Sequence, residues 1–196
     1  RDASKEEIRK RIENNTITEI FNKIEVSKGD CVMVKAGTIH AIGAGILICE
    51  IQQNSNCTYR MYDYDRRDKF GNKRELHVDK ALDVVDTKRY VPYESSSNAY
   101  DEALNEAAAT IEADSSEGQL LVSCKYFECY KYDISDSVSI NVDTAYFRSV
   151  IFTEGCGTIR VGEDVKAYKV GDSFYITAGN KTVEIEGNCV AIVTKV

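Results

Sequence analysis

The stretch that decides the fold is Lys28-Gly-Asp-Cys-Val-Met-Val-Lys-Ala-Gly-Thr-Ile-His-Ala-Ile-Gly-Ala-Gly45. Its Gly-Asp pair predicts a turn, and residues 31–34 predict a short buried strand directly after that turn. The Ala-Gly pair further along turns the chain again before His40, and residues 46–53 predict a second strand. The stretch therefore indicates a strand hairpin that carries one imidazole in its bend.

His40 is one of only two histidines in the chain, and it lies at a bend marked by glycines. Imidazole is the commonest side-chain metal ligand and transfers protons near neutral pH, so His40 is a candidate for either task. A histidine in a turn is also commonly a structural residue that forms a hydrogen bond. The residues by themselves leave both interpretations open.

The composition excludes several classes of protein. The 196 residues carry a formal net charge of -7, so the clustered basic surface of a nucleic-acid-binding protein is not expected. No apolar run approaches the roughly 20 residues of a membrane helix, which argues against a membrane protein. The seven cysteines form no Cys-x-x-Cys pair and are odd in number, which favours reduced thiols and a cytoplasmic protein. The oligomeric state stays open.

Two capping boxes predict helices at the start of the chain. A Ser-Lys-Glu-Glu box opens a helix over residues 4–13, and a Thr-Ile-Thr-Glu box opens a second helix directly afterwards. Beyond the hairpin, the pattern predicts a strand over 58–62, a polar loop over 63–72 and a helix over 76–85. The mixed charges of the polar loop are typical of a solvated surface.

The last part of the chain alternates short apolar runs with glycines and predicts no helix. Strands are expected around residues 120–124, 126–134, 138–142, 146–153, 157–161, 173–177, 182–186 and 189–194, with turns at Gly155, Gly162, Gly171 and Gly187. Many short strands joined by glycine turns imply a mainly β protein, a sandwich or jelly roll.

The hairpin occurs twice in the sequence. Placing Gly171 on Gly29 superposes one Gly-Asp pair on the other, and it also superposes an Ala-Gly pair and a later glycine. Two copies of one hairpin are what two cupin-type barrels in one chain would produce. His40 corresponds to Thr182, and the second copy contains no histidine. We therefore expect the C-terminal barrel to lack a metal site and to be structural or regulatory.

Four motifs follow one another: Ala-Gly-Thr-Ile-His-Ala at 36–41, Glu-Ile-Gln-Gln-Asn-Ser-Asn at 50–56, Tyr-Arg-Met-Tyr-Asp-Tyr-Asp-Arg at 59–66 and Arg-Glu-Leu-His-Val-Asp-Lys-Ala at 74–81. Together they resemble the type I mannose-6-phosphate isomerases in their short bacterial form. The match is dense from residue 28 to about residue 86 and thinner to the C-terminus. The resemblance implies cupin barrels, a Zn²⁺ cofactor and a small sugar phosphate as the substrate.

The resemblance also implies roles for individual residues. His40 would be a zinc ligand and Arg60 a catalytic residue near the sugar phosphate. Gln52, Asn54 and Asn56 lie beside Arg60 in the sequence and are candidates for substrate binding. Judged without the resemblance, Arg60 could equally be a surface or sheet-pairing arginine.

The chain departs from the family at several points. The other metal ligands of the family, a Gln-x-His pair and a Glu, are expected upstream of the matched region and are not found here. Because the chain opens on Arg1-Asp2, we expect it to be an incomplete fragment. Lys35, Ile42 and Asn56 stand where relatives more often have proline, tyrosine and, in some, aspartate.

The predicted organisation has three parts. Residues 1–91 would be the C-terminal part of a catalytic cupin with two N-terminal helices, 92–118 an acidic and partly helical linker, and 119–196 a complete C-terminal cupin. The predicted function is zinc-assisted aldose–ketose isomerisation of mannose 6-phosphate and fructose 6-phosphate by the full-length protein, the fragment alone being inactive. The alternatives are a non-catalytic module that binds a sugar phosphate and a plain structural cupin.

Overall fold

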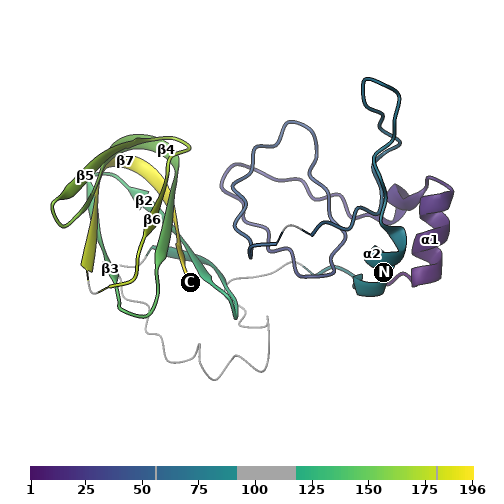
Figure 1. The fold of residues 1–196 in the computed structure, drawn as a ribbon, viewed down its shortest axis with the longest axis horizontal. Coiled ribbons are helices and arrows are strands. Elements are labelled where there is room, and N and C mark those ends of the chain that lie inside the picture. The colour runs from purple at the N-terminus through teal and green to yellow at the C-terminus, as the bar shows by residue number, and fades with distance from the viewer. Residues whose placement is uncertain (56, 92–117, 180) are drawn as a thin grey trace. The chain divides into compact units, whose positions relative to one another are not determined.

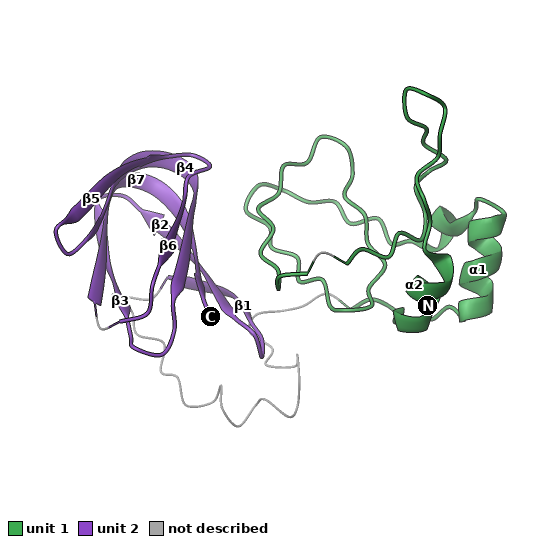
Figure 2. Ribbon diagram, viewed as in Figure 1, with its two compact units in different colours: residues 1–92 green, residues 93–196 purple. Residues whose placement is uncertain are grey.

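The chain forms two compact units, residues 1–92 and 93–196, which are coloured separately in Figure 2. The computed structural model describes residues 1–55, 57–91, 118–179 and 181–196. Asn56 and nearly all of the predicted linker, residues 92–117, therefore lie outside the described residues. Each unit has its own hydrophobic core, and the two are described separately below.

The first unit contains two α-helices, α1 (Lys5–Glu13) and α2 (Val78–Val84) (Figure 1). The Ser4 hydroxyl accepts a hydrogen bond of 3.1 Å from the Glu7 N–H, which satisfies one of the free donors at the start of α1. The capping box therefore predicted this helix correctly. The helix predicted over 76–85 is also confirmed, and it is shorter at both ends.

The second predicted helix is wrong, because only the short 3₁₀ helix η1 (Ile17–Ile20) forms. The Thr16 side chain makes no capping hydrogen bond. The Glu19 carboxylate instead pairs with the Arg11 guanidinium of α1 at 3.0 Å. An acid that is engaged by the preceding helix cannot complete a capping box, so one turn is all that forms.

A small apolar cluster joins these helices. Its buried members are Ile8 of α1, Ile17 of η1 and Leu82 of α2. Ile39 and Met61 pack against the same cluster from the intervening chain. Two distant loop segments are therefore fixed on one core, each next to a residue of predicted function.

The strands predicted over 31–34, 46–53 and 58–62 are wrong, because none of these segments is a strand among the described residues. Many of their apolar side chains face solvent: Leu47 is 98% exposed and Val32 is 48% exposed. The one bridge that the described part of this unit contains joins Arg67 to Lys73 in the loop that rises from the unit in Figure 1. An alternating pattern becomes a strand only where a partner strand accepts its backbone hydrogen bonds.

The second unit is a curled antiparallel sheet, as Figure 1 shows. Its strands are β1 (Gln119–Ser123), β2 (Glu128–Ile134), β3 (Ser137–Val142), β4 (Arg148–Val161), β5 (Asp164–Lys169), β6 (Ser173–Ile176) and β7 (Lys181–Lys195). The main path through the sheet is β1-β2-β7-β4-β5. The long strands β4 and β7 pair with each other along their length. On its other edge, β4 pairs first with β6 and then with β5. In the same way, β7 pairs first with β3 and then with β2.

The sequence prediction divided β4 and β7 wrongly into two strands each, and it missed β5. Gly155 and Gly157 lie inside β4, and Gly187 lies inside β7. A Cβ atom on Gly155 would lie 1.9 Å from the Asn188 carbonyl oxygen, and one on Gly157 would lie 1.9 Å from that of Glu186. These glycines therefore allow two strands to approach closely, and only Gly162 and Gly171 mark turns as predicted.

The interior of the barrel is filled with aromatic and branched side chains. Phe152 is fully buried, and its ring is stacked on that of Tyr168 with centroids 3.5 Å apart, while Phe174 meets it edge-on. The Tyr168 hydroxyl donates to the Glu186 carbonyl at 3.1 Å, so its polar end is satisfied. The inner faces of the strands thus form one packed core.

The two Gly-Asp pairs form the same turn. In the first copy the Asp30 N–H donates to the Ser27 carbonyl at 3.1 Å, and the Ser27 N–H donates to an Asp30 carboxylate oxygen at 2.7 Å. In the second copy the corresponding bonds join Asp172 and Lys169 at 3.1 and 3.0 Å. The internal repeat therefore extends to the hydrogen bonds of this turn.

Candidate functional site

His40 is exposed and is oriented by its own loop. Its Nδ1 lies 2.9 Å from the Thr38 carbonyl oxygen. A carbonyl can only accept, so Nδ1 carries the proton, and the lone pair of Nε2 is available for a metal ion or a proton. This is the usual way in which a backbone carbonyl fixes the tautomer of a metal-binding histidine.

The loop before His40 is held against the end of α2. Gly37 has φ +83°, and its carbonyl accepts a hydrogen bond of 2.9 Å from the Asp86 N–H. A Cβ atom at this position would lie 2.8 Å from the Val84 carbonyl oxygen. Glycine is therefore required here both by the left-handed backbone and by the close approach of the helix end.

Arg60 is tied to His77 through its backbone. The His77 N–H donates to the Arg60 carbonyl at 2.7 Å, and the Arg60 N–H donates to His77 Nδ1 at 3.2 Å. Among the described residues, the Arg60 guanidinium makes one long hydrogen bond, 3.4 Å to the Glu75 carbonyl. Most of its five donors are consequently available to a ligand.

His77 has a structural role in this arrangement. It occupies the N-cap position of α2, and its Nδ1 acts as an acceptor, so the proton lies on Nε2. That Nε2 is 3.9 Å from a carboxylate oxygen of Glu75. Through the bond that Nδ1 accepts, His77 fixes the backbone of Arg60.

The other predicted site residues are less well defined. Gln52 and Asn54 are exposed, and Asn56 lies outside the described residues. No hydrogen bond or ion pair joins Gln52, Asn54, His40 or Arg60 to one another in the described part of the chain. His40 and Arg60 are linked only through their neighbours in the sequence among the described residues. Ile39 and Met61 pack on the same apolar cluster.

The fit of a zinc ion to these residues is partial. His40 presents an oriented imidazole of the kind that zinc prefers. No group of three or more His, Cys, Asp or Glu side chains that could hold a metal ion occurs among residues 1–55, 57–91, 118–179 and 181–196. A zinc site that included His40 would therefore need further ligands from outside these described ranges.

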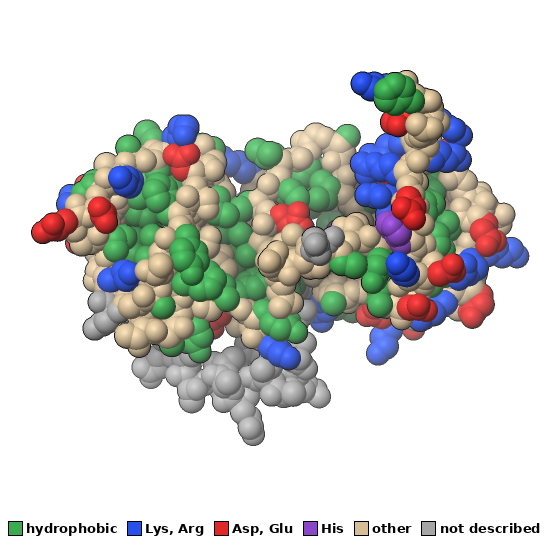
Figure 3. Space-filling view, in the orientation of Figure 1, with side chains coloured by type: hydrophobic (Ala, Val, Ile, Leu, Met, Phe, Trp, Pro, Cys, Tyr) green, Lys and Arg blue, Asp and Glu red, His purple; other side chains and the backbone are tan. Residues whose placement is uncertain are grey.

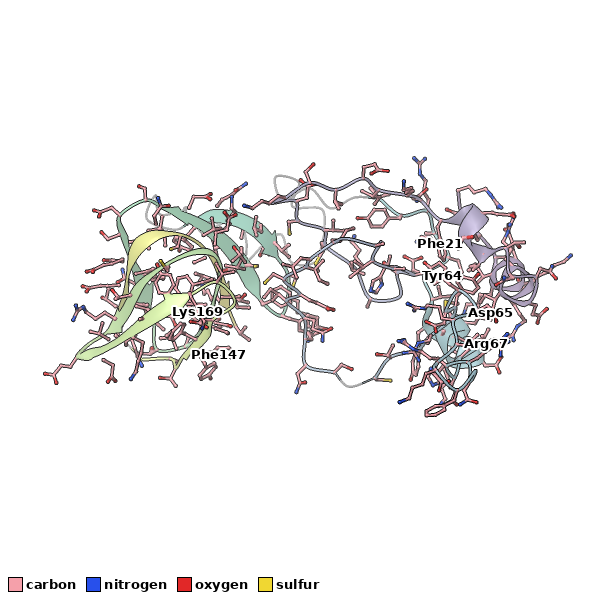
Figure 4. The ribbon with its side chains drawn as sticks, turned by 90° about the horizontal axis from the view of Figure 1, so that it is seen from above. Phe21, Tyr64, Asp65, Arg67, Phe147 and Lys169 are labelled. Atoms are coloured by element: carbon pink, nitrogen blue, oxygen red, sulfur yellow. The ribbon has the colours of Figure 1, made fainter. Side chains whose placement is uncertain are left out.

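Sequence reasoning missed Asp63, which is 6% exposed although it lies in the loop predicted to be polar and solvated. The hydrogen bond from the Arg66 guanidinium holds the pKa of the Asp63 carboxyl below its usual range, and the charges of Arg74 and Arg60 act in the same direction. The available signal was the spacing of Asp63 and Arg66, three residues apart around a turn. Tyr64, Asp65 and Arg67 of this loop lie at the same end of the first unit in Figure 4.

At the position equivalent to His40, the second unit has Thr182 in β7, whose hydroxyl lies 3.4 Å from the Asn141 side-chain oxygen. The described part of the barrel therefore presents no imidazole at this point. The jelly-roll sheet with a filled interior defines the C-terminal unit as a cupin-fold domain. Residues 117–196 match the family model described as mannose-6-phosphate isomerase, cupin domain.

Relatives match almost the whole chain. It is 35% identical over 192 residues to mannose-6-phosphate isomerase ManA of Bacillus subtilis, covering 98% of this chain and 57% of that protein. It is 36% identical to mannose-6-phosphate isomerase of Streptococcus mutans over 185 residues, covering 94% of this chain and 54% of that protein. The crystal structure of the Bacillus subtilis mannose 6-phosphate isomerase superposes with a TM-score of 0.80 at 31% identity, covering 100% of this chain and 58% of that one.

These matches confirm the resemblance to the mannose-6-phosphate isomerases that the motifs predicted, and with it the mainly β cupin fold. The chain spans little more than half the length of the relatives that it matches. Among the described helices, none combines the length and the apolar character that crossing a membrane would require.

Proposed function

We propose that this chain is part of a mannose-6-phosphate isomerase that interconverts mannose 6-phosphate and fructose 6-phosphate in the cytoplasm. The observation that supports the proposal is the 35% identity to ManA over 98% of the chain, with a matching fold. Because the chain spans 57% of that relative, we further propose that the remaining metal ligands come from polypeptide upstream of Arg1. The C-terminal cupin would then be structural or regulatory.

His40 would contribute one imidazole to a zinc site. A zinc ion bound there would supply a Lewis acid that polarises the sugar oxygens at C1 and C2. The hydrogen bond from Nδ1 to the Thr38 carbonyl leaves the lone pair of Nε2 as the group that would bind the zinc ion. The role of the chain at this point is to present an oriented imidazole.

Arg60 would bind oxygens of the substrate. Aldose–ketose isomerisation moves a hydrogen between C1 and C2 through an enediol, so negative charge develops on oxygen. A guanidinium offers a planar fork of donors to such oxygens or to the phosphoryl group. Gln52, Asn54 and Asn56 would hydrogen-bond sugar hydroxyls. The backbone pairing with His77 keeps Arg60 in place while its side chain is used.

The test is Arg60→Lys in the full-length protein. Lysine keeps the charge and loses the fork, so kcat/KM for mannose 6-phosphate should fall about ten- to a hundredfold with little change in Tm. A defect in kcat would place the contact in the transition state, and one in KM would place it on the phosphate. Arg160→Lys is the matched control, because Arg160 pairs with Glu184 on the barrel.

Unchanged kinetics together with a lowered Tm would assign Arg60 to the fold and contradict the proposal. The rival function, a non-catalytic module that binds a sugar phosphate, predicts saturable binding of fructose 6-phosphate with no isomerisation in the full-length protein. The isolated 196-residue chain should show negligible isomerase activity and weak zinc binding, since one imidazole is fewer than the three protein ligands of a catalytic zinc site.

A further inference from the structure

The loop from Arg60 to Arg74 concentrates positive charge in an acidic protein. This segment contains six basic and three acidic side chains, whereas the whole chain has a net charge of -7. Lys and Arg side chains gather over this part of the first unit in Figure 3. Such a local excess of one sign needs a physical reason, because like charges repel each other.

Asp63 supplies part of that reason. One oxygen of its buried carboxylate accepts a hydrogen bond from the Arg66 guanidinium. The other oxygen, Oδ2, lies 3.7 Å from Arg74 Nε and accepts no hydrogen bond from any described residue. Burying a carboxylate costs free energy unless it is paired with cations. Asp63 therefore fixes the positions of Arg66 and Arg74, and the two arginines stabilise its charge.

The backbone here adopts an unfavourable turn that brings the pair together. Tyr64 and Asp65 have φ values of 55° and 53°, and the Arg66 N–H donates to the Asp63 carbonyl at 3.0 Å. Two consecutive left-handed residues form a type I′ turn, which usually requires glycine or asparagine. Asp65 also pairs with Lys73 across the loop. The strained turn is what places Asp63 beside Arg66.

The arginines remain open to solvent although their carboxylate is buried. The side chain of Arg66 is 61% exposed and that of Arg74 is 56% exposed, against 7% for Asp63. A guanidinium has five N–H donors, and one carboxylate uses only some of them. The exposed donors can form the bidentate contacts that phosphoryl oxygens favour.

We propose that Asp63 is a positioning residue that holds Arg66 and Arg74 in place, so that these two guanidiniums bind the phosphoryl group of a phosphate monoester. The choice of a sugar phosphate as that monoester rests on the proposed function. The buried carboxylate acts through the arginines and does not itself touch the ligand. This assigns a function to the loop that its mixed charges alone do not suggest.

The sign of the effect of Asp63 on binding separates positioning from simple charge. Removing a negative charge beside a phosphate site should strengthen phosphate binding if only the electrostatic field matters. Removing the group that orders the arginines should weaken it, because two long side chains must then be immobilised when the ligand binds. Asp63→Asn therefore gives opposite results under the two explanations.

The experiment measures binding of inorganic phosphate and of fructose 6-phosphate to the 196-residue chain by calorimetry at low salt. We expect Asp63→Asn to weaken both about tenfold, the loss expected of one well-ordered charged contact. Asp172→Asn is the matched control, because this substitution removes the same charge. Asp172 also pairs with a cation three residues away, Lys169, at a turn of the barrel. It should bind like the unsubstituted chain.

Equal or tighter binding by Asp63→Asn, or no phosphate binding by the unsubstituted chain, would overturn the proposal. The amide NMR spectrum shows whether Asp63→Asn folds. If it does not fold, Asp63→Glu is tested instead, since glutamate keeps the charge and displaces the carboxylate. Unchanged phosphate affinity of Asp63→Glu would also overturn the proposal. Phosphate binding could depend on Asp63 while the full-length protein shows no isomerase activity. That combination would uphold the anion site and reject only the proposed reaction.

Discussion

Residues 31–34 and 46–53 of the first unit carry short apolar runs that predict strands, as do many segments of the second unit, but among the described residues only the second unit forms a sheet. In the barrel, β4 and β7 pair over 13 residue pairs, and Phe152, Ile185 and Ala191 are fully buried. In the first unit Leu47 is 98% exposed. The difference shows that alternation specifies which face of a strand is apolar, whereas partner strands decide whether the strand exists.

The largest effect should come from emptying the barrel core. Phe152→Ala removes a ring that stacks on Tyr168 and meets Phe174, and should cost about 3 to 5 kcal/mol in the free energy of unfolding of the barrel. Leu47→Ala should change stability by less than about 0.5 kcal/mol. Denaturant unfolding of both variants is the measurement. Equal losses would mean that the loop of the first unit has a packed core of its own.

The equivalent glycines of the two copies should respond unequally. Gly37→Ala places a Cβ 2.8 Å from the Val84 carbonyl oxygen at φ +83°, and should cost about 2 to 4 kcal/mol through strain and displacement of α2. Gly179→Ala at φ +141° meets only the flexible Lys181 side chain, and should cost about 1 to 2 kcal/mol. Thermal unfolding checks the order, and a larger loss at Gly179 would contradict it.

The Gly-Asp turn allows a comparison with matched geometry. Asp172→Ala and Asp30→Ala each remove one backbone-to-carboxylate hydrogen bond, worth about 1 kcal/mol. Because residues 169–172 connect β5 to β6, Asp172→Ala should lower the unfolding midpoint of the barrel. Asp30→Ala should instead increase local amide exchange over 27–38 and leave global unfolding unchanged. A global shift from Asp30→Ala would show that its segment unfolds together with the helices.

The smallest expected effect is a pH dependence confined to the first unit. The pKa of Glu7 is lowered from 4.5 to about 2, mainly by the hydrogen bond from Arg1 and then by that from Arg11. Because the folded pKa is depressed, this contribution is present above pH 4.5 and is lost as the pH falls toward 2. Glu7→Gln should therefore unfold more easily than the unsubstituted chain at pH 6, and most of that difference should be lost at pH 2. A constant difference across that window would rule out the ion pairs as its cause.

Local signals predicted two of the three expected helices and part of the sheet. The box at Ser4 predicted α1 because a cap requires only neighbouring residues, whereas the box at Thr16 failed because Arg11 engages Glu19. Glycines in β4 and β7 resembled turns because sequence does not distinguish a turn from a close strand contact. Strand pairing joins residues far apart in the chain, so the sequence of residues 31–34, 46–53 and 58–62 alone could not show that these segments do not form strands.

The candidate site was predictable to a similar extent. His40 and Arg60 were singled out through motifs, and their roles stay predictions with which their local hydrogen bonds are compatible. Asp63 was missed because a charged loop is usually solvated, and only the structure shows its carboxylate buried under arginines. Asn56 lies outside the described residues, so its role stays a prediction.

The central claim is that the first copy of the hairpin carries the chemistry and the second carries structure. The most direct test compares His40→Ala with Thr182→Ala in the full-length protein, measuring bound zinc by mass spectrometry and turnover of mannose 6-phosphate. We expect His40→Ala to lose both zinc and activity and Thr182→Ala to keep both. Equal loss from the two substitutions, or retention of zinc and activity by His40→Ala, would contradict the account.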